Sequence, residues 1–260
     1  MTVVGDWRVH LVPSQAMLVA GLLLAWHATA LAAEGSACWT PKQLGAREGD
    51  AAIRKDVADA YRPLPTEPAH TASSPYPELA GKVLRRVDLP PGKKLVAFTF
   101  DLCEQPFEIS GYQGDIVDFL RDNNVKATFF AGGKWLVTHP ERAEQLLADP
   151  LFEVENHAWE HRNFRVVTKP VRLSEIDGAL GAYAEVKQRL AQRMCLARDG
   201  KPVNQSAAPR QTLFRFPFGA CTPEAIAEVT SRGLLPVQWD ISSSDPWAGQ
   251  TVDQLIATVM

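Results

Sequence analysis

Two histidines, His157 and His161, lie four positions apart in the stretch ENHAWEH, in a chain of 260 residues that contains only six histidines. Neutral imidazoles are ligands that zinc and similar divalent ions favour in proteins. Histidine pairs at this spacing are also common as ordinary core and surface residues. The choice between a metal site and a structural pair therefore depends on which other reactive side chains the fold brings to them.

Reactive side chains recur at the ends of apolar, β-prone segments. Four segments end in, or run directly into, such a residue: Asp101, His157, Arg215 and Asp240. Because the loops that follow parallel strands converge on one edge of a sheet, we expect these side chains to share a rim. A metal held by histidines and a carboxylate that takes a proton together describe hydrolysis of an amide or ester. Asp240 either lines this rim or only caps its strand, and the sequence leaves both readings open.

The elements that would position these residues alternate along the chain from Lys94 onward. The β-prone runs are 96–100, 127–131, 152–156, 213–217 and 236–240, and the helical patterns are 115–122, 141–149, 172–194 and 223–232. Thr138 and Glu141 predict a capping box, with a proline at the first helical position. Strands that alternate with helices predict a parallel sheet with helical crossovers.

The first 93 residues have a different texture. Residues 1–33 contain an apolar run of about ten residues, Met17–Trp26, which is too short to span a bilayer because a span needs roughly twenty. Basic residues precede this run, and the small residues at 30–32 follow it, which predicts a cleaved signal peptide. Translation from Met17 instead of Met1 stays open. Residues 34–93 are rich in proline, alanine and charge and predict an irregular arm with one short helix near 50–61.

Export decides how the four cysteines are interpreted. Cys38, Cys103, Cys195 and Cys221 all follow the signal peptide, so an oxidising compartment predicts one or two disulfides, with three complete pairings that spacing does not separate. We expect a periplasmic or secreted monomer with no stable membrane span after signal cleavage. Lys and Arg number 27 against 30 Asp and Glu, for a net charge of −3. This balance argues against a nucleic-acid partner.

Four segments resemble, in order and spacing, the first four motifs of polysaccharide deacetylases of the NodB-homology type (carbohydrate esterase family 4). They are FTFDLCE at 98–104, ENHAWEH at 155–161, RFPFG at 215–219 and WDISSSDPW at 239–247. The resemblance covers about 94–260 and implies an α/β fold, a distorted (β/α)7-type barrel. It also implies removal of acetyl groups from an acetylated polysaccharide, with a divalent metal as cofactor: zinc, or alternatively cobalt or nickel.

The resemblance implies a role for each matching residue. Asp101 resembles the catalytic base, and Arg215 resembles the arginine that holds the base. His157 and His161 resemble metal ligands. Phe218 stands where the family usually has tyrosine; the family uses the backbone N–H there as an oxyanion donor, which any side chain supplies.

Three further positions match the later motifs. Pro217 belongs to the same substrate-binding turn as the oxyanion donor. Asp245 resembles the carboxylate that tunes a general-acid histidine. Trp247 resembles an aromatic that lines the substrate groove, displaced by one residue through Pro246.

The chain departs from the family pattern in its first motif. Leu102 stands where the family has a second aspartate that binds the metal, and leucine cannot bind a metal. Glu104 is the nearest oxygen donor and the tentative replacement. A site completed by water, and the sulfur of Cys103, are the alternatives.

The second departure is the last motif, since no histidine follows His161. Residues 251–260 begin an apolar helix with a capping box from Thr251 to Gln254. We therefore expect a C-terminally truncated form of a longer enzyme, without the last strand and the general-acid histidine, and with impaired activity.

These observations predict a signal peptide at 1–33, an arm at 34–93 and a deacetylase domain at 94–260. The function they predict is metal-dependent removal of N-acetyl or O-acetyl groups from a cell-envelope or extracellular polysaccharide. A non-catalytic glycan-binding relative and an amidohydrolase of a small non-polymeric amide are the alternatives.

Overall fold

The computed structural model describes residues 38–58, 74–193, 195, 210–245, 247 and 249–260. The predicted signal peptide and both candidate start positions lie outside the described residues, as does part of the predicted arm. No helix within the described ranges is long and apolar enough to cross a bilayer.

Five parallel strands form one sheet in the order in which they occur along the chain. They are β1 (Phe98–Leu102), β2 (Ala127–Ala131), β3 (Phe152–Asn156), β4 (Leu213–Phe214) and β5 (Leu235–Pro236). The predicted parallel α/β architecture is confirmed. In the described residues the sheet does not close into a barrel, because β1 and β5 are its two ends.

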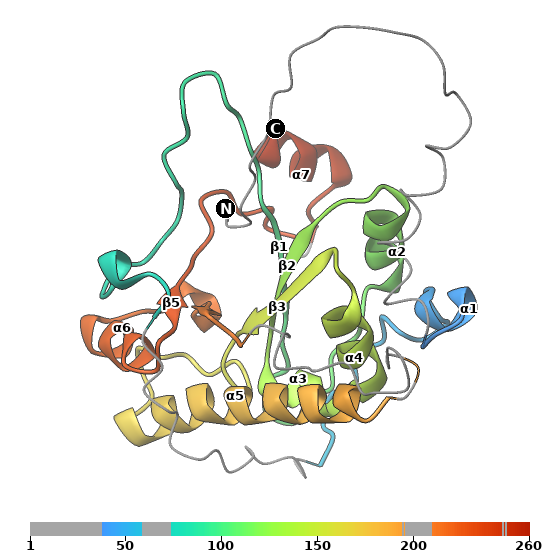
Figure 1. Cartoon of the computed structure of the whole chain (residues 1–260), viewed down its shortest axis with the longest axis horizontal. Helices are drawn as coiled ribbons and strands as arrows, with labels where there is room; N and C mark the ends of the chain where they lie inside the picture. Colours follow the sequence, from blue (N-terminus) through green and yellow to red (C-terminus); the bar gives the residue numbers. More distant parts are fainter. Residues whose placement is uncertain (1–37, 59–73, 194, 196–209, 246, 248) are drawn as a thin grey trace, which may run out of the picture.

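The helices connect the strands as crossovers. They are α1 (Pro41–Leu44), α2 (Gly114–Asp122), α3 (Gly133–Thr138), α4 (Pro140–Ala148), α5 (Lys169–Ala191), α6 (Pro223–Thr230) and α7 (Val252–Val259), with 3-10 turns at η1 (Pro77–Leu79) and η4 (Pro217–Gly219). In Figure 1, α5 runs along one side of the molecule with α3 and α4 beside it, and α7 lies on the opposite side. Asp101 lies near the end of β1, and the other predicted reactive residues lie in the loops that follow the strands.

The sheet holds the residues at its carboxyl edge directly. The parallel ladder continues past the strands, because the His157 N–H donates to the Ala131 carbonyl at 3.1 Å and the Arg215 N–H donates to the Asn156 carbonyl at 2.9 Å. Two predicted reactive residues therefore begin their loops while still hydrogen-bonded to neighbouring strands. The sheet therefore fixes the backbone of both residues.

One face of β1 packs against the hydrophobic core. Phe100 and Leu102 pack against a buried cluster that includes Phe129, Trp135 and Leu146. Burial of each such side chain stabilises the fold by roughly 1.5–3 kcal/mol. Strand β1 thus presents alternate residues to the core and to the site.

Three local predictions were wrong. Residues 50–58 contain no helix, and the short helix of this arm is α1 instead. Thr138 does not cap α4, because it is the last residue of α3 and its hydroxyl donates to Glu104. Strands β4 and β5 are two residues each, so Arg215 lies in the loop after β4. The capping box between Thr251 and Gln254 is confirmed.

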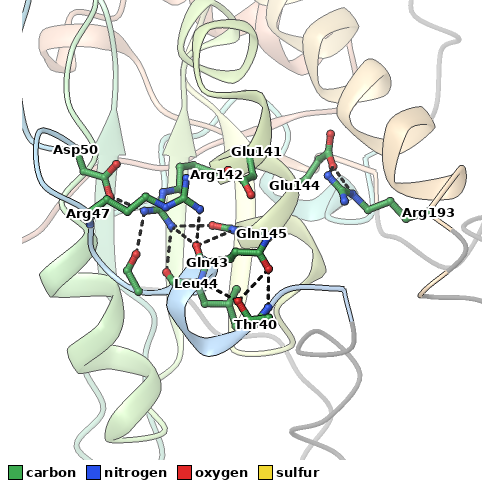
Figure 2. Close-up of polar contacts among 11 residues, drawn as sticks. Thr40, Gln43, Leu44, Arg47, Asp50, Glu141, Arg142, Glu144, Gln145 and Arg193 are labelled. Atoms are coloured by element: carbon green, nitrogen blue, oxygen red, sulfur yellow. Dashed lines mark hydrogen bonds and ion pairs between the residues drawn. The ribbon is translucent and has the colours of Figure 1, made fainter.

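Several contacts join the described part of the N-terminal arm to the domain, and they include the backbone bridges of Arg54 with Ile109 and of Leu84 with Val237. A disulfide joins Cys38 to Cys195, which leaves Cys103 and Cys221 as free thiols. Arg142 of α4 donates to the carbonyl oxygens of Gln43, Leu44 and Gly45 and to the carboxylate of Asp50; Figure 2 shows its contacts with Gln43, Leu44 and Asp50. One of the expected disulfides is therefore present.

Candidate active site

Asp101 projects from β1 toward the carboxyl edge of the sheet, on the same face as Thr99. Arg215 binds both residues: one guanidinium nitrogen donates to Asp101 Oδ1 at 2.8 Å and to Thr99 Oγ1 at 2.9 Å. The Arg215 guanidinium is almost fully buried and lies 3.9 Å from the centre of the Phe130 ring. A buried guanidinium paired with a carboxylate forms a short, charge-assisted contact. This pair holds one carboxylate oxygen and leaves Oδ2 directed at the site.

His157 follows β3 and is 1% exposed. Its Nδ1 lies 2.9 Å from the carbonyl oxygen of Arg215. A carbonyl only accepts, so Nδ1 carries the ring proton and Nε2 presents a lone pair. Nε2 has no hydrogen-bond partner and lies 3.7 Å from Asp101 Oδ2, beyond hydrogen-bond range. Burial lowers the pKa of His157, so the ring is neutral at pH 7.

His161 completes the pair, with its ring centre 5.1 Å from that of His157. Its Nδ1 is buried and has no hydrogen-bond partner. Burial, helped by the neighbouring His157 ring, lowers the pKa of His161 to about 3. Both rings are therefore neutral, and each presents a free nitrogen.

A side chain of α5 binds the backbone of the 157–161 loop. One carboxylate oxygen of Glu175 accepts the backbone N–H groups of Trp159 and Glu160 at 3.1 and 3.0 Å. Glu175 is 3% exposed, and burial raises its pKa to about 7. Sequence reasoning missed this residue, because a glutamate inside a helical pattern gives no sign that its side chain binds a distant loop.

The backbone at the start of α3 also binds this loop. The N–H groups of Gly133 and Lys134 donate to the carbonyls of Ala158 and Trp159. A Cβ atom at Gly133 would lie 2.5 Å from the Trp159 ring, which explains the glycine. His161 has φ of 57°, a conformation that non-glycine residues adopt only when their surroundings impose it. The two histidines are thus positioned before any ion binds.

Cys103 joins the histidines. One ligand atom from each of Cys103, His157 and His161 lies within 4.8 Å of the others. Two unpartnered buried nitrogens beside a sulfur fit a divalent ion such as zinc. Burial, with the negative charge of Asp101 as a smaller contribution, raises the pKa of the Cys103 thiol to about 12.

Glu104 does not join them. Its side chain is fully buried on the other side of the loop, where Oε1 accepts from the Ser110 N–H at 3.2 Å and the Thr138 hydroxyl at 2.8 Å and lies 3.5 Å from His139 Nδ1. Burial raises the pKa of Glu104 to about 7. This placement corrects the expectation that Glu104 supplies the missing metal ligand.

The 217–219 turn lies against His161. The Phe218 ring centre is 4.3 Å from that of His161, and the side chain is 56% exposed. Phe218 has φ of 58°, and in the described part of the chain its N–H makes no hydrogen bond. Pro217 begins this turn and is buried. The structure therefore brings Phe218 to the site together with the histidines.

The residues of the fourth motif are placed elsewhere. Asp245 is exposed and accepts from the Ser243 hydroxyl, and Trp247 is 75% exposed. Among the described residues, neither forms a hydrogen bond, ion pair or ring contact with Asp101 or a histidine. Asp240 forms an ion pair with Arg86 at 2.7 Å, and this contact gives no support to the interpretation that Asp240 lines the rim of the site.

Comparisons with known proteins give matches over much of the chain. A family model described as polysaccharide deacetylase matches residues 88–237. A chitooligosaccharide deacetylase of Bradyrhizobium sp. (strain ANU 289) is 29% identical over 169 residues, which are 65% of this chain and 66% of that protein. A chitooligosaccharide deacetylase of Rhizobium leguminosarum bv. phaseoli is 23% identical over 65% of this chain and 63% of that protein. The match thus spans slightly less than two thirds of each relative.

Solved structures share the fold. A peptidoglycan N-acetylglucosamine deacetylase has a TM-score of 0.53 at 21% identity, over 71% of this chain and 72% of that chain. A CE4 family pseudoenzyme from Bacillus anthracis has a TM-score of 0.50 at 19% identity, over 66% and 52%. Both likenesses show the same fold.

Proposed function

Because the chain belongs to the polysaccharide deacetylase family, we propose that it hydrolyses N-acetyl or O-acetyl groups of a cell-envelope or extracellular polysaccharide, with a divalent metal as cofactor. One observation carries this proposal: the Asp101–Arg215 ion pair lies beside the buried His157 and the half-buried His161, two neutral rings whose ligand atoms lie within 4.8 Å of each other. A proton acceptor and a pair of metal ligands are the two parts that this hydrolysis needs.

Asp101 acts as the general base. Arg215 binds Oδ1, so Oδ2 is free to take the proton of the water that attacks the acetyl carbon. The bond between the acetyl carbon and the sugar nitrogen or oxygen then breaks, the proton taken up by Asp101 passes to that nitrogen or oxygen, and acetate leaves. General-base assistance of this kind typically accelerates hydrolysis about 10²–10⁴-fold.

His157 and His161 hold the metal ion. When bound, such an ion supplies a positive charge that polarises the acetyl carbonyl. The Arg215 carbonyl keeps the proton of His157 on Nδ1, which reserves Nε2 for the ion. The Phe218 N–H stabilises the oxyanion, because it is unpaired and belongs to the turn that packs on His161.

Export to the periplasm or the medium, as a monomer, is part of the proposal. The Cys38–Cys195 disulfide supports it, since disulfides persist in oxidising compartments and are rare in reducing ones. An exported enzyme would meet a cell-envelope or extracellular polysaccharide in those compartments. We also propose that Asp245 tunes a general acid and that Trp247 lines the substrate groove. Both roles require the segment that carries these residues to approach the sugar.

A non-catalytic glycan-binding function is the second candidate. Leu102 favours it, because it stands where the family has a metal-binding carboxylate, and one protein of the same fold is described as a CE4 family pseudoenzyme. Hydrolysis of a small, non-polymeric amide is the third candidate. Substrates of different length distinguish it from polysaccharide deacetylation.

Acetate release tests these functions directly. The purified chain, supplied with zinc, cobalt or nickel, is incubated with chitin oligomers, peptidoglycan, acetylated xylan and free N-acetylglucosamine. We expect acetate from at least one polymer or oligomer and little from the monosaccharide. Binding of a glycan without acetate release would favour the non-catalytic function, and preference for the monosaccharide would favour the small-amide hydrolase.

A further inference from the structure

We infer that Cys103 supplies the third protein ligand, as a thiolate, to a divalent metal held by His157 Nε2 and His161 Nδ1. The inference rests on the proposed function, because it concerns the metal of the same site. It assigns a site of two imidazoles and one sulfur, which favours zinc or cobalt over magnesium or calcium.

Leu102 cannot supply the ligand, because a leucine side chain has no donor atom and here it packs against the core. Successive side chains of a strand point to opposite faces. Thr99 and Asp101 share the face that Arg215 binds, while Leu102 packs into the core. An extended chain returns to the Asp101 face at position 103, which places the Cys103 side chain beside the histidines.

The geometry fits a bound ion closely. The three ligand atoms lie within 4.8 Å of one another. Ligands of a tetrahedral zinc ion, with Zn–S near 2.3 Å and Zn–N near 2.0–2.1 Å, are separated by roughly 3.3–3.6 Å. The limit of 4.8 Å is longer than these separations, and small side-chain rotations would bring the three atoms to them. His157 is 1% exposed and its Nε2 has no partner, so a buried lone pair already faces the sulfur.

The backbone on both sides of Cys103 is fixed. Before it, the Leu102 carbonyl accepts from the Gly132 N–H at 2.7 Å. After it, the buried Glu104 carboxylate binds Ser110 and Thr138, and the Gln105 carbonyl accepts from Lys134 Nζ at 2.9 Å. Glu104 therefore contributes to the site as an anchor of the loop that carries Cys103.

The competing donors are engaged elsewhere. Arg215 binds Oδ1 of Asp101, and its free Oδ2 does not belong to the group of ligand atoms that lie within 4.8 Å of one another; Glu104 faces α3. The disulfide occupies Cys38 and Cys195, and the remaining free thiol, Cys221, packs beside a different hydrophobic cluster around Phe216.

A cobalt titration tests the inference without relying on activity. In a Cys221→Ser background, Cys103 is the only free thiol. We expect cobalt to produce a thiolate-to-metal charge-transfer band in the near ultraviolet, at one equivalent per chain. Cys103→Ser should abolish the band and weaken zinc binding by at least about 10-fold, since a second-shell change alone typically costs 10–100-fold. Zinc should also protect Cys103 from alkylation by iodoacetamide.

Each result separates this inference from the proposed function. A cobalt-loaded protein without the thiolate band, or an unchanged band in Cys103→Ser, would overturn the inference, and so would a protein that binds no cobalt. Acetate release by a protein that lacks the band would leave the proposed function standing. A band with no acetate release from any substrate would support the metal site and overturn the hydrolase. Cys103→Ala, with folding checked by circular dichroism, serves as the second variant if Cys103→Ser is unstable.

Discussion

The carbonyl oxygen of Arg215 lies 2.9 Å from Nδ1 of His157, and this contact decides which ring nitrogen faces the site. The guanidinium of the same arginine binds the Asp101 carboxylate at 2.8 Å. One residue therefore fixes the orientation of the base with its side chain and the tautomer of a metal ligand with its backbone. Replacement of the Arg215 side chain leaves the second contact in place, so the two effects can be separated.

The His157→Ala variant should lose the metal. Removal of one of two imidazoles leaves a single nitrogen donor, and we expect zinc affinity to fall at least about 100-fold, by analogy with the 10–100-fold cost of second-shell changes. Isothermal titration with zinc measures this loss. His139→Ala is a matched control, because His139 lies beside Glu104 and outside the group of ligand atoms. Equal losses in the two variants would contradict the assignment.

The Glu175→Gln variant should change how stability depends on pH. Burial raises the pKa of Glu175 to about 7, so the folded state keeps a proton that the unfolded state releases near its ordinary pKa of about 4.3. Wild-type stability contributed by this group is therefore fully present below pH 4.3 and is lost as pH rises to about 7. Glutamine never ionises and still accepts both loop N–H groups.

Glu175→Gln should consequently be more stable than wild type at pH 8, by as much as about 3 kcal/mol, because each pKa unit corresponds to about 1.4 kcal/mol. The difference should vanish near pH 4. Urea unfolding at the two pH values measures it. A variant that is less stable than wild type at pH 8 would show that the carboxylate binds the 159–160 backbone in its ionised form.

The Cys38–Cys195 disulfide closes a segment with a sequence separation of 157 residues. Its removal in the Cys38→Ser/Cys195→Ser double variant should destabilise the fold by about 2–4 kcal/mol, because the unfolded chain gains conformational freedom. Thermal unfolding measures the change, with Cys221→Ser as control. A melting temperature equal to that of the control would mean that the other contacts of the arm, including those of Arg142 and the two backbone bridges, hold it without the disulfide.

Phe218→Ala should affect substrate binding more than turnover. The variant keeps the backbone N–H, while it removes an exposed ring that packs on His161. Aromatic contacts of this kind are worth about 0.5–1.5 kcal/mol, so KM should rise roughly 2–10-fold. Steady-state kinetics on a chitin oligomer separates the two constants. A large fall in kcat with unchanged KM would contradict the backbone role.

Much of the fold was predictable because the strand signals were strong. The runs at 127–131 and 152–156 match β2 and β3 residue for residue. Asp101, His157, His161 and Arg215 were predicted to meet, and they do, since each follows or ends a strand of one parallel sheet.

The failures have physical causes. Glu104 was the nearest oxygen donor in sequence, but the chain turns after β1 and sends its side chain to Thr138. Sequence distance carries no information about that turn. Threonine is a common helix cap, but Thr138 does not cap α4 because its backbone belongs to the last turn of α3. Glu175 and Gly133 act on a loop distant in sequence, so no local pattern identifies them.

The central claim is that Asp101 handles the proton while the histidines hold the ion. It is tested most directly by the Asp101→Asn variant, assayed for bound zinc and for acetate release on the best substrate of the wild type. We predict stoichiometric zinc, as in wild type, with turnover reduced about 10²–10⁴-fold, the usual worth of a general base. Turnover equal to that of the wild type in a zinc-loaded Asp101→Asn protein would contradict the account.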